Sequence, residues 1–145
     1  MVDEATLEVF RATLGYTDEQ WEKWKSDARN LKLVETLMAN FAENQKLRLV
    51  AEVTSSYGCG AQHKVGDRIV FANGVNLQCK ESPDQICYGL LLPIIPYLAV
   101  FNERICNGED PDKYIFPMLH CVDVGVDRGG WGEVIAKIKV EKIQD

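Results

Sequence analysis

Leu47-Arg48-Leu49-Val50-Ala51-Glu52-Val53-Thr54 is the stretch at which the hydrophobic pattern of this chain changes from helical to alternating. Its odd-numbered residues are all apolar, whereas three of its four even-numbered residues are polar or charged. Because successive side chains of an extended segment point to opposite faces, this alternation predicts a half-buried β-strand. The same alternation from Val134 to Val140 predicts another strand near the end of the sequence.

The residues before this first strand follow a helical pattern. Apolar residues recur at helical spacing from residue 4 and stop at Gly15, which is typical of a helix end. Thr17 and Gln20 fit a capping box at the start of a second helix. Asn30 is a candidate cap for a third helix, although a stretch without glycine or proline from residue 17 to 45 also allows one long helix. We therefore expect a helical arm, residues 1–45, and an α+β domain, residues 46–145.

A hairpin is expected after the first strand. Arg68–Ala72 and Val75–Cys79 are strand-like and flank Asn73-Gly74, a pair that supplies the positive φ angles of a type I′ turn. Met118–Val124 is a further candidate strand. Since strands joined by tight turns run in opposite directions, these segments predict an antiparallel sheet.

A central helix is expected between the hairpin and the late strands. Ser82 and Pro83 fit the cap and the first position of this helix, which would be interrupted at Pro93 and Pro96. Residues 86–101 carry no charge, but these 16 residues are too few for a membrane-spanning helix, which needs about 20. The expected fold class is α+β, with an antiparallel sheet packed on a central, proline-broken helix and an N-terminal helical arm.

The composition is that of a globular chain with an acidic balance. The 145 residues carry a formal net charge of −6 and show no basic stripe, so we expect neither a nucleic-acid partner nor a membrane. The first residues, Met1 to Glu4, are acidic where a secretory signal would be basic. Five cysteines are an odd number, which favours free thiols or metal ligands in a reducing, cytoplasmic compartment.

The loop Gly58–Asp67 is the most informative stretch for function, because it places Cys59 and His63 close together between glycines. A metal interpretation combines these two residues with two later cysteines, Cys87 and Cys121. Cys87 is expected in the first turn of the central helix, where the helix dipole favours a thiolate. Three cysteines and one histidine form a set that zinc accepts tetrahedrally, and iron is the other candidate metal.

Two other interpretations of the same residues remain open. The cysteines are compatible with buried structural thiols beside a hydrogen-bonded histidine, because free cysteine behaves as a small apolar side chain. Alternatively, the chain is a small enzyme or small-molecule-binding domain in which Cys59 or Cys87 is the nucleophile and His63 the base or acid. His120 and Tyr97 would line the same pocket. The sequence leaves open whether the chain is an enzyme.

Trp21 and Trp24 lie three positions apart, so they share one face of a helix. They either pack onto this protein's own sheet or anchor a partner chain, since aromatic residues are enriched in interface hot spots. The sequence shows no recognisable catalytic triad or phosphate loop. Our leading expectation is therefore a small cytoplasmic accessory or interaction protein that works with a larger enzyme subunit or as a homo-oligomer.

The order of these motifs resembles a family of small prokaryotic domains to which no activity is assigned. The family is marked by Cys-x-x-x-His-Lys-x-Gly-Asp, which corresponds here to Cys59–Asp67, followed by a central-helix cysteine, here Cys87, and an Ile-Pro-Tyr segment, here Ile95–Tyr97. A late Cys-x-Asp corresponds to Cys121–Asp123, and the match covers residues 46 to 143. The resemblance implies a shared fold and a shared Cys/His constellation. It implies no reaction.

Overall fold

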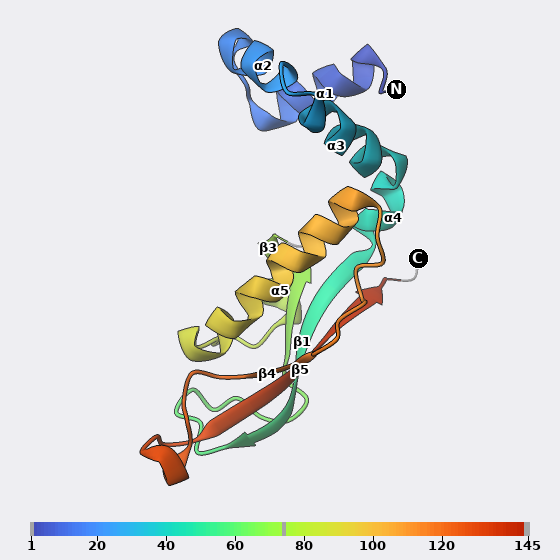
Figure 1. Cartoon of the computed structure of the whole chain (residues 1–145). Coiled ribbons are helices and arrows are strands. Elements are labelled where there is room, and N and C mark those ends of the chain that lie inside the picture. Colours follow the sequence, from blue (N-terminus) through green and yellow to red (C-terminus); the bar gives the residue numbers. More distant parts are fainter. Residues whose placement is uncertain (1, 74, 144–145) are drawn as a thin grey trace.

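The computed structural model describes residues 2–73 and 75–143 and has the expected α+β architecture (Figure 1). The arm consists of helices α1 (Glu4–Leu14), α2 (Asp18–Lys25), α3 (Ala28–Ala39) and α4 (Phe41–Gln45). The sheet consists of strands β1 (Leu47–Tyr57), β2 (Arg68–Ala72), β3 (Asn76–Leu77), β4 (Met118–His120) and β5 (Glu133–Lys142). The long helix α5 (Tyr88–Asn107) and the short 3₁₀ turns η1 (Cys79–Glu81) and η2 (Val126–Arg128) complete the described elements.

The sheet is antiparallel, with the strand order β3-β2-β1-β5-β4. Strand β1 lies at its centre and pairs with both β2 and β5. The alternation in the sequence is confirmed, because Leu49, Ala51 and Val53 of β1 are buried in the main core. Val134, Ala136 and Ile138 of β5 join them there.

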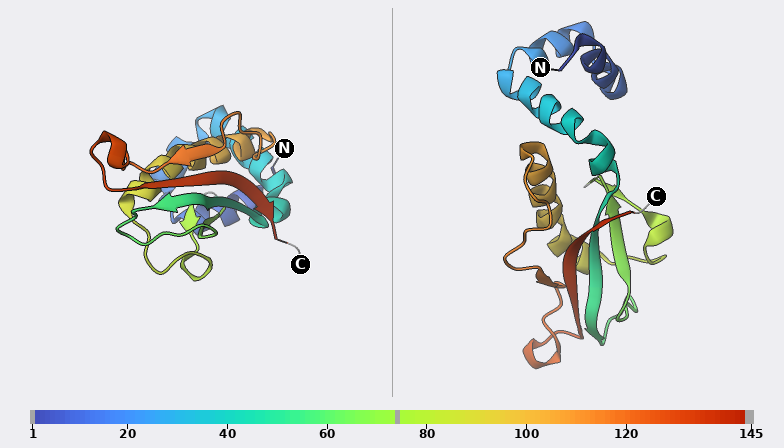
Figure 2. Two further views of the ribbon diagram at one scale, coloured as in Figure 1. Left: turned by 90° about the horizontal axis from the view of Figure 1, so that it is seen from below. Right: turned by 90° about the vertical axis from the view of Figure 1, so that its right-hand side faces the viewer.

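Helix α5 covers one face of this sheet, and the arm extends beyond one end of it (Figure 2). Leu90, Ile94, Phe101 and Ile105 project from one side of α5 into the core, where burial of such side chains contributes about 1.5–3 kcal/mol each. By length and composition alone, α5 could cross a membrane. Its buried side instead packs as the core helix of the sheet.

The expected interruption of the central helix at its two prolines does not occur. Pro93 and Pro96 lie inside one continuous helix. A proline removes the amide that would bond to the carbonyl four residues earlier. For Pro93 that carbonyl belongs to Gly89, and it accepts a hydrogen bond from the Val122 amide (3.0 Å). A donor from the segment after β4 therefore replaces the missing helical bond.

The central helix also begins later than expected. Cys87 occupies its N-cap, so the prediction of a start at Ser82 and Pro83 was wrong. The Ser82 hydroxyl accepts the amide of Val70 in β2 (3.0 Å) instead of capping a helix. This long-range bond ties the loop before α5 to the sheet.

The hairpin forms, with two differences from the expectation. Ala72 pairs with Asn76, so three residues separate the strands, and β3 ends at Leu77 rather than Cys79. Asn73 has the expected positive φ of 54°. Gly74, the second residue of the expected type I′ turn, lies outside the described residues. The late strand is also shorter than expected, because β4 ends at His120.

The arm confirms one expected cap and corrects another. Thr17 and Gln20 form the capping box of α2 in both directions. Helix α3 begins after Asp27, whose carboxylate accepts the Arg29 amide (2.9 Å) and separates α3 from α2. Asn30 lies inside α3, where its amide donates to the carbonyl of Trp24 (2.9 Å). Both the Asn30 cap and the single long helix were therefore wrong.

The two tryptophans of α2 do not form an exposed anchor. Their rings stack on each other with centroids 5.1 Å apart, and Trp21 is only 3% exposed. Phe10 and Tyr16 pack against the pair. The aromatic cluster therefore packs within the arm and not onto the sheet.

Candidate functional site

Three of the five cysteines line one small pocket. The pocket measures about 170 Å³ and lies between the loop after β1, the start of α5 and the segment after β4. Cys59, Cys87 and Cys121 come from these three elements, and Tyr88 and Glu133 line the pocket with them. Cys79 and Cys106 are not among its lining residues. The fold therefore brings together the three cysteines that the sequence had singled out.

His63 supports this pocket but does not line it. The ring is 4% exposed, and its Nε2 accepts a hydrogen bond from the main-chain amide of Cys87 (3.3 Å). Its Nδ1 lies 3.6 Å from an oxygen of Asp67. Because an acceptor Nε2 carries no proton, the geometry assigns the hydrogen to Nδ1, facing Asp67. Nε2 thus ties the loop to the N-cap of α5, whereas Nδ1 faces a carboxylate of the same loop.

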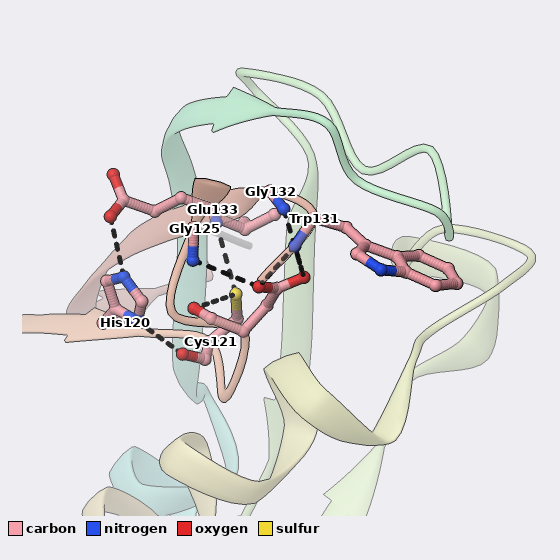
Figure 3. Close-up of polar contacts among 8 residues, drawn as sticks. His120, Cys121, Gly125, Trp131, Gly132 and Glu133 are labelled. Carbon is pink, nitrogen blue, oxygen red and sulfur yellow. Dashed lines mark hydrogen bonds and ion pairs between the residues drawn. The ribbon is translucent and has the colours of Figure 1, made fainter. Parts of the chain in front are cut away.

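Cys121 is the most enclosed of the three pocket cysteines. Its Sγ accepts the amide of Val134 in β5 (3.3 Å) and lies 3.8 Å from the carbonyl oxygen of Asp123 (Figure 3). The Cys121 amide donates to the carbonyl of the same Val134 (2.9 Å). These two contacts with Val134 hold Cys121 in a fixed orientation beside β5.

The tetrahedral set expected from the sequence is not assembled in this conformation. Within the described residues, no group of three or more His, Cys, Asp or Glu side chains is arranged to hold a metal ion. His63 is separated from the set because its Nε2 is occupied by the Cys87 amide. Tyr97 does not line the pocket either, and its hydroxyl donates to the carbonyl of Phe116 (2.7 Å). Besides the three cysteines, the lining residues of the pocket include two carboxylates, Asp123 and Glu133.

His120 lies beside the pocket and is paired with Glu133. Its Nε2 is 2.8 Å from a Glu133 oxygen, and its Nδ1 contacts the carbonyl of Cys121. The Glu133 carboxylate, together with this carbonyl, raises the pKa of His120 above its ordinary value of 6.5. The Glu133 carboxylate therefore favours the protonated form of this partly exposed imidazole at the rim of the pocket.

The loop after Cys121 is organised around one carboxylate. Asp123 accepts the amides of Gly125 (3.1 Å), Trp131 (3.1 Å) and Gly132 (3.1 Å), as Figure 3 shows. The Gly125 amide, followed by those of Gly132 and Trp131, lowers the pKa of Asp123 below its ordinary value of 3.8. One charged side chain thus closes the loop from residue 123 to 132 at the edge of the thiol pocket.

This closed loop presents a tryptophan to solvent. The indole of Trp131 is 82% exposed and turns away from the amide–carboxylate hydrogen bonds (Figure 3). The loop packs closely on the end of β1. Gly132 lies so near the main chain of Tyr57 and Gly58 that a Cβ atom on it would clash with them. Sequence reasoning missed this feature. The run of glycines from 129 to 132 around a tryptophan was the available signal.

Replacing Asp123 with asparagine is expected to lower the thermal stability of the protein at pH 7. Asparagine offers one acceptor oxygen in place of two, and its amide nitrogen would face main-chain N–H groups. Because the folded-state pKa of Asp123 is depressed, its carboxylate contributes stability above the unfolded-state pKa. That contribution is lost as the pH falls through the folded-state pKa.

The difference in melting temperature between the two proteins should therefore shrink as the pH falls from 7 to below the ordinary carboxyl pKa of 3.8. Thermal denaturation followed by circular dichroism measures it. Asp127→Asn, an exposed carboxylate on the same loop, is the matched control and should melt like the wild type. A difference that stays constant with pH would show that the Asp123 charge is not responsible.

No protein-family model, curated protein or solved structure matches this chain. The resemblance to the small prokaryotic domains therefore stays a prediction from the sequence motifs. The structure defines the class of protein at the level of architecture: an α+β domain with an antiparallel sheet, a core helix and a helical arm.

Proposed function

We propose that this chain is a small accessory protein that binds a soft metal ion through the thiols of Cys59, Cys87 and Cys121. The supporting observation is their convergence on one pocket from segments 28 and 34 residues apart in sequence, since 87 − 59 = 28 and 121 − 87 = 34. Thiolate sulfur is the donor that soft ions such as Cu(I), and also Zn(II), prefer. A pocket of about 170 Å³ has room for an ion but not for a large organic molecule.

Binding in this way requires Cys59 and Cys87 to turn toward Cys121. A cysteine side chain has a single χ1 torsion with three staggered rotamers, and rotation about this torsion is the movement that the proposal requires. The amide of Val134 already points at the Cys121 sulfur and would support it as a thiolate. His63 acts as an outer support in this proposal, because it holds the main chain of Cys87.

The test is an anaerobic titration of the reduced protein with cadmium(II), followed by the ultraviolet absorption of the sulfur–cadmium charge transfer. We expect about one equivalent per chain and a release of protons as the thiols ionise. Cys59→Ser and Cys87→Ser should each weaken binding by at least about tenfold, the smallest loss typical even of outer partners. Cys79→Ser and Cys106→Ser are the matched controls and should bind like the wild type.

Two results would contradict this proposal. One is a protein that takes up no cadmium although it is folded and reduced. The other is binding that the two control substitutions weaken as much as the pocket substitutions do. If, in addition, one pocket thiol is alkylated much faster than the others, the alternative of a small enzyme with a nucleophilic cysteine would be favoured.

We further propose that the accessory role involves self-association through the outer face of α5. Tyr88, Leu92 and Ile95 are exposed along this helix at the spacing i, i+4 and i+7, so they share one face, and exposed apolar patches on soluble proteins mark interaction sites. The double variant Leu92→Lys, Ile95→Lys should remain folded and reduce the native mass measured by sedimentation. Glu103→Lys, another exposed position of α5, should not. A wild-type chain that is monomeric at all concentrations would contradict self-association.

A further inference from the structure

The three cysteines of the thiol pocket lie in unequal surroundings. Cys121 is 8% exposed, whereas Cys59 and Cys87 are only partly buried. All three are free thiols, although they line one pocket of about 170 Å³. A disulfide requires two cysteine Cβ atoms about 3.5–4.5 Å apart, so only neighbouring thiols form one. The contacts between the segments that carry these cysteines therefore decide which pair is placed to react.

The segments that carry Cys87 and Cys121 are bonded directly to each other. The amide of Val122, the residue after Cys121, donates to the carbonyl of Gly89, two residues after Cys87 (3.0 Å). This is the bond that replaces the helical hydrogen bond lost at Pro93. The start of α5 is therefore fixed against the segment after β4 at the position of the two cysteines.

Gly89 allows these two segments to approach closely. A Cβ atom at this position would lie 2.9 Å from Cγ2 of Val122 and 3.9 Å from Sγ of Cys87. The first distance is shorter than real Cβ contacts, so a side chain here would displace Val122. The second distance shows that the Cys87 sulfur lies beside the same contact. The Cys87 sulfur and the residue that follows Cys121 thus border one narrow space.

The two cysteines of this pair differ in access and in orientation. Cys87 is the more accessible of the two, so an oxidant that enters the pocket reaches its sulfur first. The Cys121 sulfur is oriented by β5, because it accepts the amide of Val134 (3.3 Å), a contact that a thiolate keeps. One cysteine is therefore placed to meet the oxidant and the other to react with the oxidised sulfur.

We propose that Cys87 and Cys121 form a reversible disulfide when hydrogen peroxide enters the pocket. The Cys87 thiolate attacks the O–O bond and becomes a sulfenic acid, while the second oxygen takes up a proton and leaves as water. The Cys121 thiolate then attacks the Cys87 sulfur, and the hydroxyl group takes up a proton and leaves as a second water. Two thiols are thus oxidised and one peroxide is reduced. Rotation of Cys87 about χ1 is the movement that the second step requires.

The size of the pocket determines the class of oxidant, and the position of the disulfide determines its consequence. A volume of about 170 Å³ admits hydrogen peroxide, whereas a large disulfide such as oxidised glutathione exceeds it. The disulfide removes two of the three sulfur donors of the pocket. Oxidation therefore prevents metal binding, a consequence that rests on the function proposed above.

The test treats the reduced, metal-free full chain with one equivalent of hydrogen peroxide. We expect the loss of two of the five thiols when they are titrated after denaturation, and dithiothreitol should restore both. Peptide mapping under non-reducing conditions should identify a disulfide between Cys87 and Cys121. Cys87→Ser should slow the loss of thiols by about tenfold or more. Cys79→Ser and Cys106→Ser, outside the pocket, should lose two thiols at the rate of the wild type.

Two glycine substitutions test the geometry without removing a thiol. Gly89→Ala displaces Val122, so it should slow disulfide formation by about tenfold or more, because a misplacement of about 1 Å can cost an oriented reaction about 100-fold. Gly60→Ala, in the loop that carries Cys59, is the matched control, since a Cβ there meets nothing within 4 Å. Circular dichroism should show both variants folded.

A folded wild-type chain that keeps five thiols would overturn the disulfide, as would mapping that finds a different pair. A Gly89→Ala protein that reacts like the wild type would overturn the geometry. These results do not depend on any metal. An oxidised protein that takes up cadmium(II) as the reduced protein does would overturn the effect on metal binding. A reduced protein that takes up no cadmium(II) but forms the disulfide would contradict the metal-binding function and support the disulfide.

Discussion

Replacing Gly132 with alanine is expected to destabilise this protein strongly. A Cβ at this position would lie well under 3.0 Å from main-chain atoms of Tyr57 and Gly58, a separation that real Cβ atoms essentially never show. Because the obstacle is main chain rather than a flexible side chain, β1 and the loop from 123 to 132 must separate. Overpacking costs typically about 1–3 kcal/mol, and we expect the upper end of this range or more.

Urea denaturation measures this loss as a lower transition midpoint at an unchanged m value. Gly60→Ala is the matched control, because it lies in the neighbouring loop and a Cβ there meets nothing within 4 Å. The Gly132 variant should also lose part of the contacts that the Trp131 and Gly132 amides make with Asp123. A Gly132→Ala protein as stable as the wild type would mean that the loop does not pack on β1 as described.

Replacing Phe101 with alanine should have the largest effect in the core. Phe101 is 0% exposed and is the largest fully buried side chain among the described residues, placed where α5 faces the sheet. Removal of a buried phenylalanine side chain loses its transfer free energy and leaves a cavity, which together cost about 3–5 kcal/mol. For a protein with a free energy of unfolding of about 5–15 kcal/mol, this is a large share of the total.

The adjacent exposed residue provides the control for Phe101. Val100→Ala changes the same helix on its outer face and should alter the free energy of unfolding by no more than about 0.5 kcal/mol. Denaturant titrations of the two variants separate the cavity effect from any change in helix propensity. Similar losses in both variants would contradict the orientation of α5 on the sheet.

The pocket cysteines show how much the sequence motifs predicted. Neighbouring residues and the family resemblance separated Cys59, Cys87 and Cys121 from Cys79 and Cys106, and the first three line one pocket. The same reasoning placed His63 among the donors. In the structure His63 Nε2 accepts the amide of Cys87, a bond between residues 24 positions apart that no local pattern indicates.

Local pattern was sufficient for the elements whose hydrogen bonds and burial repeat along the chain. The alternation in β1 and β5, the helix end at Gly15 and the capping box at Thr17 all depend on residues within a few positions of each other. Such short-range geometry is the same in any fold, so the residue types alone specify it.

Features that depend on contacts between distant segments could not be derived in this way. The late start of α5 is accompanied by the hydrogen bond from the Val70 amide to Ser82, and its continuity through Pro93 by the hydrogen bond from the Val122 amide to the Gly89 carbonyl. Residues 59–61 of the loop Gly58–Asp67 line the thiol pocket together with the start of α5 and the segment after β4, and a cavity under the arm lies between α1 and the C-terminal half of α5. In each case the packing of the sheet, the core helix and the arm determines which residues are in contact. The order of residues along the chain does not reveal this packing.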